Sequence, residues 1–133
     1  MKDIIKLENA IKEYEQVDIQ VLHNFTNDMY IRQAIIPKGM LIVGKRHRHE
    51  TLNILLKGKM VIYDGNKTIE VEAPFIVVSK PYTKKAGLAL EDSIWCNIHS
   101  TTSKDLEEIE KEFIIPEEEY DKLIEYKEQA CLG

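Results

Sequence analysis

The sequence predicts a mainly β protein in which short strands form a sandwich or barrel, preceded by one helix and followed by two. Between residues 17 and 100, apolar runs rich in Ile and Val recur roughly every 8–12 residues, and turn-forming residues separate them. The clearest hairpin joins residues 59–63 to 67–71, because the Asp64-Gly65-Asn66 turn between them readily adopts positive φ. At 133 residues the chain matches a single domain. We therefore expect one domain over residues 1–133, with a barrel at about 17–100 and a helical tail at about 102–130.

Helical periodicity marks both ends of the chain. A helix is expected over residues 4–16, with Asp3 as its N-cap. After residue 100, Thr102 or Ser103 is placed to cap a second helix, and Pro116 suits the first turn of a third. The apolar positions are Ile4, Leu7, Ile11 and Tyr14 in the first helix, Leu106, Ile109 and Phe113 in the second, and Tyr120, Leu123, Ile124 and Cys131 in the third.

Charge is distributed unevenly along the chain. The net charge is −5, yet residues 101–133 carry 11 acids and 4 bases, whereas residues 32–85 carry 11 bases and 4 acids. The acidic balance of the whole chain does not suit binding to a nucleic-acid polymer. No apolar run approaches the length of a membrane span, the first ten residues do not resemble a signal peptide, and two cysteines are too few for a disulfide framework. We therefore expect a cytoplasmic protein that binds neither nucleic acid nor membrane.

The most informative segment is residues 44–58, GKRHRHETLNILLKG. If this segment is a strand, His47, His49, Thr51 and Asn53 share one face, because successive side chains alternate between faces. A row of four hydrogen-bonding side chains is costly to bury without partners, so this face is expected to line a polar interior. Two histidines separated by one residue also point in parallel, which suits the binding of one metal ion.

In its Gly44, its His47-Arg48-His49 and its closing Leu55-Leu56-Lys57-Gly58, this segment resembles the first signature motif of the cupins, a superfamily of small jelly-roll β-barrels. The resemblance covers about residues 29–100, because Glu72-Ala73-Pro74 with Pro81 resembles the second motif of the family. Small phage-encoded cupins of unassigned function are similar, with a comparable histidine pair and an acidic helical tail. The resemblance implies a cupin-like jelly-roll barrel between the predicted helices.

Two of the four metal ligands that the resemblance implies are absent. Thr51 stands where the first motif has a glutamate, and Glu50 beside it points to the opposite face of a strand. Lys84 and Lys85 follow Pro81, where the second motif has a histidine. An ammonium group at that position repels a divalent cation.

One further histidine offers compensation. On the expected strand 93–99, Trp95, Asn97 and His99 share a face. If that face points inward, His99 joins His47 and His49 as the third ligand of a divalent metal ion, with positions left open for water. The alternative is that His99 is a hydrogen-bonded histidine near the mouth of the barrel.

Basic and aromatic residues predict a different kind of ligand. Arg32 lies opposite in phase to its apolar neighbours, and with Lys84 and Lys85 it brings positive charge to the expected pocket. Guanidinium and ammonium groups suit a phosphate or carboxylate, and the flat face of Trp95 suits a planar ring. Taken singly, each of these residues also fits an ordinary core or surface role. The expected ligand-binding residues are His47, His49, Thr51, Asn53, Trp95, Asn97, His99, Arg32, Lys84 and Lys85.

The sequence leaves three functions open. The favoured one is non-catalytic binding of a small anionic, nucleotide-like or sugar-phosphate ligand in the barrel. The second is a metal-dependent enzyme of the sugar-phosphate isomerase or dioxygenase type that uses His47, His49 and His99. The third is a structural or protein-interaction cupin, such as a viral accessory protein, whose acidic helices dock a partner. A homodimer is expected, because exposed sheet edges otherwise invite uncontrolled association.

Overall fold

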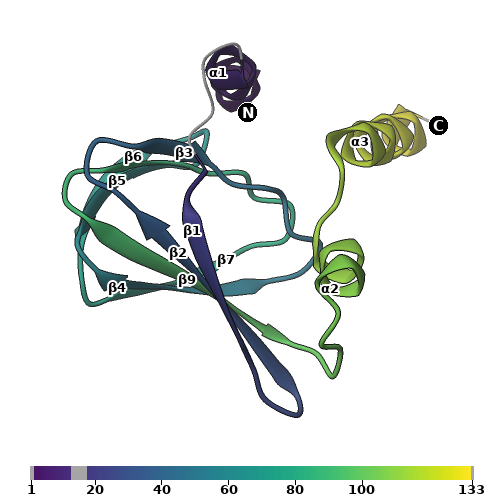
Figure 1. Cartoon of the computed structure of the whole chain (residues 1–133). Helices are drawn as coiled ribbons and strands as arrows, with labels where there is room; N and C mark the ends of the chain where they lie inside the picture. The colour runs from purple at the N-terminus through teal and green to yellow at the C-terminus, as the bar shows by residue number, and fades with distance from the viewer. Residues whose placement is uncertain (1, 13–17, 133) are drawn as a thin grey trace.

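Two antiparallel sheets face each other around a common interior in the computed structural model, which describes residues 2–12 and 18–132 (Figure 1). In this described part, one sheet has five strands in the order β1-β2-β9-β4-β7, and the other has four in the order β3-β8-β5-β6. The elements are α1 (Lys2–Lys12), β1 (Gln20–Phe25), β2 (Met29–Ile36), β3 (Leu41–Val43), β4 (Thr51–Lys57), β5 (Lys59–Tyr63), β6 (Thr68–Glu72), β7 (Phe75–Ser79), β8 (Ala86–Ala89), β9 (Ser93–Ser100), α2 (Leu106–Phe113) and α3 (Glu117–Leu132).

The strand order is that of a jelly roll. In the five-stranded sheet, β9 pairs with both β2 and β4, and in the four-stranded sheet β8 pairs with both β3 and β5. The chain therefore crosses repeatedly from one sheet to the other, which rolls the strands into a barrel. The predicted class is confirmed: a mainly β jelly-roll barrel with a helix before it and two helices after it.

One end of the barrel interior is filled by apolar side chains. The cross-strand register places Ala34 of β2 opposite Trp95 of β9, which in turn lies opposite Leu55 of β4. Because directly paired residues in antiparallel strands point to the same face, these three side chains form one layer of the core. The buried residues of this cluster are Ala34, Ile36, Leu55, Met60, Ile62, Val71 and Ala89.

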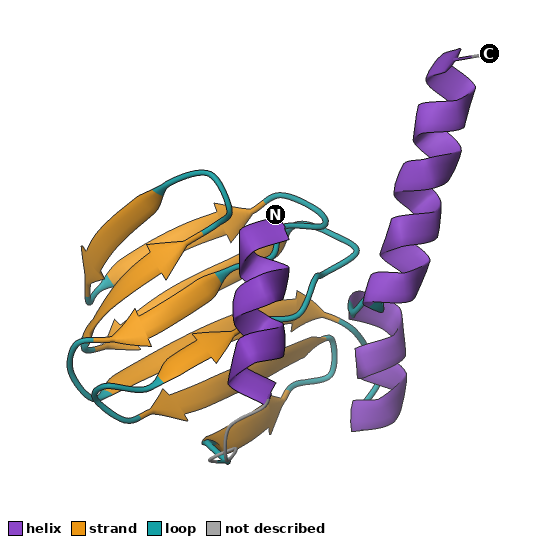
Figure 2. Ribbon diagram, turned by 90° about the horizontal axis from the view of Figure 1, so that it is seen from above, coloured by secondary structure: helices purple, strands orange, loops and turns teal. Residues whose placement is uncertain are grey.

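The helices lie outside the barrel. Figures 1 and 2 show α1 across the side formed by the four-stranded sheet, whereas α2 and α3 lie beside one end of the barrel. The side chain of Ile4 on α1 is fully buried, and Ile109 and Phe113 of α2 are buried with Tyr30 of β2 in a second small cluster. No helix in the described part of the chain is long and apolar enough to cross a membrane.

The element boundaries differ from the prediction mainly at the helix starts. Asp3 lies within the first turn of α1 and not at its N-cap, and the predicted extension through Tyr14 to residue 16 lies outside the described residues. Asp105, not Thr102 or Ser103, caps α2, because its side chain accepts a hydrogen bond from the backbone N–H of Glu107.

The predicted hairpin is confirmed. β5 pairs with β6, and Tyr63 lies opposite Thr68 across a turn in which Gly65 has a φ of 91°. Gly58 makes the tight turn that separates β4 from β5, with a φ of 94°. A Cβ atom at Gly58 would lie 2.2 Å from the Ser93 Oγ and 2.5 Å from the Asp92 carbonyl oxygen. Both the backbone conformation and the lack of space therefore require glycine at this turn.

We predict that Gly58→Ala destabilises the barrel far more than Gly39→Ala. Gly39 also has a positive φ, of 86°, but a Cβ atom there meets nothing within 4 Å. Gly39→Ala therefore carries only the cost of the left-handed conformation, about 1–2 kcal/mol. Gly58→Ala adds a steric clash against backbone atoms, which costs roughly a further 1–3 kcal/mol. Denaturant unfolding of both variants measures the difference, and equal losses would contradict this account of the turn.

Candidate functional site at the polar end of the barrel

The other end of the barrel interior is polar, and the strand register shows where the change occurs. One layer beyond the Ala34–Trp95–Leu55 layer, Arg32 lies opposite Asn97, and Asn97 lies opposite Asn53. Tyr30 lies opposite His99 in the layer beyond that. The three central strands therefore change from apolar to polar at the same level. This shared change creates a polar end, which is the candidate site.

Asparagine side chains connect the strands at this end. Asn97 Nδ2 donates to Asn53 Oδ1 at 2.7 Å, and Asn53 Nδ2 donates to Ser79 Oγ at 2.8 Å and to the Val77 carbonyl at 3.2 Å. Both asparagines are buried, as is Thr51, whose hydroxyl lies 3.4 Å from the His49 carbonyl oxygen. The hydrogen bonds offset the cost of burying these amides and hold β4, β7 and β9 in register.

Two cations face this interior without a carboxylate partner. Arg32 shares the inner face of β2 with Tyr30 and Ala34, and its guanidinium forms no hydrogen bond or ion pair with any side chain that the structure describes. Its charge helps to lower the pKa of Glu110, but that carboxylate is bonded to Lys45. The Lys85 ammonium donates to Ser79 Oγ and lies 5.5 Å from the centre of the Trp95 ring. Both side chains are half-buried, so each keeps some access to solvent.

Burial weakens the charge of Lys85. Loss of water around the ammonium lowers its pKa from 10.5 to about 8, and the distant carboxylate of Asp64 opposes that change only in part. At neutral pH the group is still mostly protonated. The polar end of the barrel therefore carries a guanidinium and an ammonium, and no carboxylate among the described residues bonds to either.

The His47-Arg48-His49 segment is not part of a strand, contrary to the prediction, because β4 begins at Thr51. His47 is half-buried and its ring centre lies 5.2 Å from that of the buried His99. His49 is exposed and turns its ring edge-on to Phe113. The predicted common face of four residues therefore contains Thr51 and Asn53 but not His49.

The C-terminal segment holds this loop in place. His47 forms an isolated β-bridge with Ile114, the backbone N–H of Arg48 donates to the Phe113 carbonyl at 2.7 Å, and that of Ile115 donates to the Arg46 carbonyl at 3.1 Å. The Phe113 ring stacks on His99 with their centres 4.3 Å apart. The end of α2 thus covers the mouth of the barrel directly above the histidine that the sequence singles out.

Both histidines at the mouth are neutral at physiological pH. Burial lowers the pKa of His47 from 6.5 to about 4, with smaller contributions from His99, Lys85 and Arg32. Burial likewise lowers the pKa of His99 to about 4, and the positive charge of Arg32 adds to the effect. The imidazoles therefore act as neutral hydrogen-bonding groups and aromatic surfaces, and they do not add to the positive charge of the site.

The residues present do not fit the metal ion that the resemblance to the cupins implies. Among residues 2–12 and 18–132, no three His, Cys, Asp or Glu side chains lie close enough together to hold a metal ion. The Phe113 ring lies against two of the three predicted ligands, His49 and His99. Lys85 adds a positive charge beside His47.

Trp95 is on the inner face, as the strand phase indicates, but it serves the core. It packs against the apolar cluster that fills the other end of the barrel, and Lys85 lies over its ring. The Lys85 ammonium would have to move before a planar ligand could stack on the face of Trp95 that it covers.

Lys84 points away from the interior. It is 2% exposed, and its ammonium lies 3.1 Å from a carboxylate oxygen of Glu8 on α1 and 3.1 Å from one of Glu117 on α3. Arg46, 1% exposed, donates to the same Glu117 oxygen at 2.9 Å and lies over the Tyr120 ring. The prediction that Lys84 joins the ligand site is therefore corrected: this lysine anchors α1 and α3 to the barrel.

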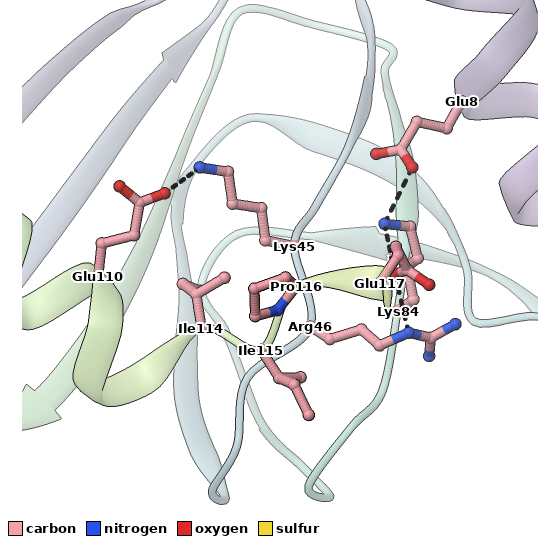
Figure 3. A pocket seen from close by; sticks show the side chains of 9 residues that line it. All are labelled: Glu8, Lys45, Arg46, Lys84, Glu110, Ile114, Ile115, Pro116 and Glu117. Atoms are coloured by element: carbon pink, nitrogen blue, oxygen red, sulfur yellow. Dashed lines mark hydrogen bonds and ion pairs between the residues drawn. The ribbon is translucent and has the colours of Figure 1, made fainter. Parts of the chain in front are cut away.

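Figure 3 shows these charges beside a pocket of about 280 Å³ between the barrel and the helices. Each lysine and arginine that lines the pocket is matched by a carboxylate, including the exposed pair of Lys45 and Glu110. A pocket with paired charges of both signs offers no net attraction to an anion. The unpaired cations inside the barrel, and not this pocket, are therefore the better candidate site.

Sequence reasoning missed Ser79 and the covering role of Phe113. Ser79 becomes important only because β7 pairs with β4 and brings it opposite Thr51. Phe113 is visible in the sequence as the last apolar position of a helix, but the chain gives no local signal that this helix ends over His99. Both roles depend on contacts between segments far apart in the sequence.

We predict that Lys84→Met destabilises the protein by about 3 kcal/mol. The substitution removes the ammonium that pairs with the partly buried carboxylates of Glu8 and Glu117. Lys45→Met removes an ammonium from an exposed pair, which is worth at most about 1 kcal/mol. The free energy of unfolding of both variants, measured with urea, gives the comparison. Equal effects would show that the Lys84 cluster does not anchor the helices.

We also predict that stability falls as the pH is lowered from about 6.5 toward 4. The folded state holds His47 and His99 neutral, whereas the unfolded chain protonates them near 6.5, so the unfolded state binds more protons in this range. At about 1.4 kcal/mol for each pKa unit, each histidine lowers the free energy of unfolding by roughly 2 kcal/mol between pH 7 and 5, so the two together lower it by roughly 4 kcal/mol. Urea titrations at the two pH values, for the wild type and for His47→Gln/His99→Gln, measure this effect. An unchanged pH dependence in the double variant would refute the assignment.

Comparisons with known proteins agree on the barrel. No family model matches the sequence, and no curated protein matches it. Among solved structures, KdgF from Halomonas sp. superposes with a TM-score of 0.56 at 19% identity, over 71% of this chain and 94% of that one. An uncharacterised protein with a double-stranded β-helix domain from Klebsiella pneumoniae gives a TM-score of 0.55 at 17% identity, over 71% of this chain and 90% of that one.

A cupin 2 conserved barrel domain protein from Salinispora arenicola gives a TM-score of 0.53 at 12% identity, over 65% of this chain and 81% of its own. At these identities the likeness concerns the fold alone. Together with the jelly-roll strand order and the histidine segment at the barrel mouth, it shows that this chain has the fold of the cupin superfamily.

Proposed function

We propose that this protein binds a small molecule with a phosphate or carboxylate group at the polar end of its barrel, without catalysing a reaction. The observation that supports this proposal is the pair of half-buried cations, Arg32 and Lys85, that face the interior and have no carboxylate partner in the described chain. Elsewhere in the described chain, the buried cations Arg46 and Lys84 are paired with carboxylates.

The energetic argument concerns unpaired charge. Moving a cation out of water is costly, and proteins normally offset the cost with a counter-ion. Burial lowers the pKa of Lys85, in agreement with that cost. An anionic ligand between Arg32 and Lys85 supplies the missing counter-charge, and the planar guanidinium can donate two parallel hydrogen bonds to one phosphate or carboxylate.

Neutral groups complete the site. Asn97 and Asn53 fix one another, so their amides are already ordered before a ligand arrives, and the neutral imidazoles of His47 and His99 lie near the mouth. Ordered neutral groups orient a ligand at little entropic cost. Lys85 occupies the face of Trp95, so we propose that the anionic group, and not a stacked base, is the feature recognised. A sugar phosphate meets that requirement as well as a nucleotide does.

We predict that Arg32→Gln weakens binding of the anionic ligand at least tenfold, because a charge-assisted contact is worth about 1.5–3 kcal/mol. Arg48→Gln is the matched control: it removes the same charge from a guanidinium that is paired with Glu119 outside the barrel, and affinity should stay unchanged. Calorimetric titration with inorganic phosphate, sugar phosphates, nucleotides, cyclic dinucleotides and ADP-ribose derivatives gives the affinities. Binding should weaken as salt is raised.

The same titrations repeated across pH test the role of Lys85. Affinity should fall as the pH rises through about 8, because the ammonium loses its proton, and Lys85→Met should abolish that pH dependence. The proposal fails if no compound in the panel binds more tightly than millimolar, or if Arg32→Gln and Arg48→Gln behave alike.

A further inference from the structure

Lys85 places a primary amine inside the barrel. Its Nζ donates to Ser79 Oγ and lies 5.5 Å from the centre of the Trp95 ring. No carboxylate in the described part of the chain bonds to it, and the side chain is half-buried, so it is not sealed from solvent. A small molecule that enters the polar end of the barrel can therefore reach this nitrogen.

The neighbouring Lys84 shows the opposite arrangement. It is also buried, but its ammonium lies 3.1 Å from a carboxylate oxygen of Glu8 and 3.1 Å from one of Glu117. Both contacts hold this amine outside the interior and occupied in ion pairs, so it is not available to attack a carbonyl carbon. Of the two adjacent lysines, Lys85 is the one placed to act as a nucleophile.

The surroundings of Lys85 favour the uncharged amine, which is the form that has a free lone pair. Loss of water lowers its pKa from 10.5 to about 8. At pH 8, about half of the molecules therefore carry a neutral amine at this position. Arg32 brings a second cation to the same end of the barrel, since the charges of Arg32 and Lys85 both act on His47. Desolvation and a neighbouring cation are two known ways to activate a lysine nitrogen.

Ser79 adds a hydrogen-bond donor beside the nitrogen. Its Oγ accepts hydrogen bonds from Lys85 and from Asn53 Nδ2, so its own O–H hydrogen remains to be donated. A hydroxyl that donates to a carbonyl oxygen stabilises the negative charge that develops there during attack by an amine. The nucleophile and this donor therefore lie next to one another.

We propose that Lys85 captures a carbonyl compound that bears a phosphate or carboxylate group, as a reversible Schiff base, while Arg32 holds the anionic group. This inference rests on the proposed function, which supplies the contact between Arg32 and the anion, and it adds a second functional group to the ligand. Reversible capture requires no net reaction, so it agrees with a binding protein.

The covalent step balances without a further reactant. The lone pair of the neutral Lys85 nitrogen forms a bond to the carbonyl carbon, and the π electrons of the carbonyl group move to its oxygen. That oxygen leaves as water with the two protons of the amine, and a C=N bond remains. Addition of one water reverses the step and releases the ligand unchanged.

The test traps the Schiff base with sodium cyanoborohydride, which reduces the C=N bond to a stable amine. The probes are glyoxylate, an aldehyde with a carboxylate group, and propanal, an uncharged aldehyde. We expect glyoxylate to label Lys85 at least about tenfold faster than the exposed Lys45, and propanal to show a smaller preference. Peptide mass mapping measures both rates, and fragmentation of the peptide distinguishes Lys85 from Lys84.

Two arginine variants test the role of the anionic group. Arg32→Gln should remove the advantage of glyoxylate over propanal at Lys85, because the carboxylate loses its partner. Arg48→Gln removes a guanidinium that is paired with Glu119 outside the barrel, and the advantage should remain. Circular dichroism checks that both variants fold, and the comparison of the two aldehydes on the wild type stands without them.

The outcomes separate this inference from the proposed function. If the wild type binds inorganic phosphate in calorimetry but glyoxylate labels Lys85 no faster than Lys45, the Schiff base is excluded and the anion site stands. If phosphate does not bind and both aldehydes label Lys85 equally fast, the anion site is wrong and the selectivity inferred here fails with it.

Discussion

The hydrogen bond from Asn97 to Asn53 is the interaction on which the site depends. It joins β9 to β4 in the buried interior, and the second amide hydrogen bond of Asn53 extends the connection to β7. Without these partners, the two amides would be buried away from water with no hydrogen bond in its place, which is costly. The interior at this level would then favour apolar residues. The paired amides therefore allow a polar layer to exist directly above an apolar one. Arg32 and Lys85 have a place in the interior because of that layer.

Position relative to the barrel wall distinguishes two kinds of buried cation. Lys84 and Lys85 are adjacent in sequence, yet Lys84 points outward into carboxylates from two helices, whereas Lys85 points inward to a serine hydroxyl and an aromatic ring. The outward lysine contributes to the attachment of α1 and α3. The inward lysine keeps an unsatisfied charge, which is the basis of the proposed affinity for anions.

Much of the fold could be predicted from the sequence, because it is encoded in local signals. The spacing of apolar runs and the Asp64-Gly65-Asn66 turn predicted a β-sandwich or barrel, and the resemblance of the histidine segment to the cupin motif implied the jelly roll. Strand alternation put Asn97 and His99 on one face, which the structure turns inward together with Arg32. The sequence could not predict that Lys84 points outward and Lys85 inward, since both lie in a loop just before β8, where side chains do not alternate regularly. The sequence also could not predict that His49 is separated from His47, because the backbone groups that hold this loop come from residues 113–115.

That bridge between the loop at residues 46–48 and residues 113–115 has a consequence for the order in which the molecule is completed. Synthesis delivers the barrel strands through Ser100 before the residues that cover the mouth. Domains form from the N-terminal side as the chain emerges, so the barrel can close while its cover is still inside the ribosome. In that interval the cationic interior is open on the side where Phe113 later stacks on His99. The cover over His99 is thus the last part of the site to be added.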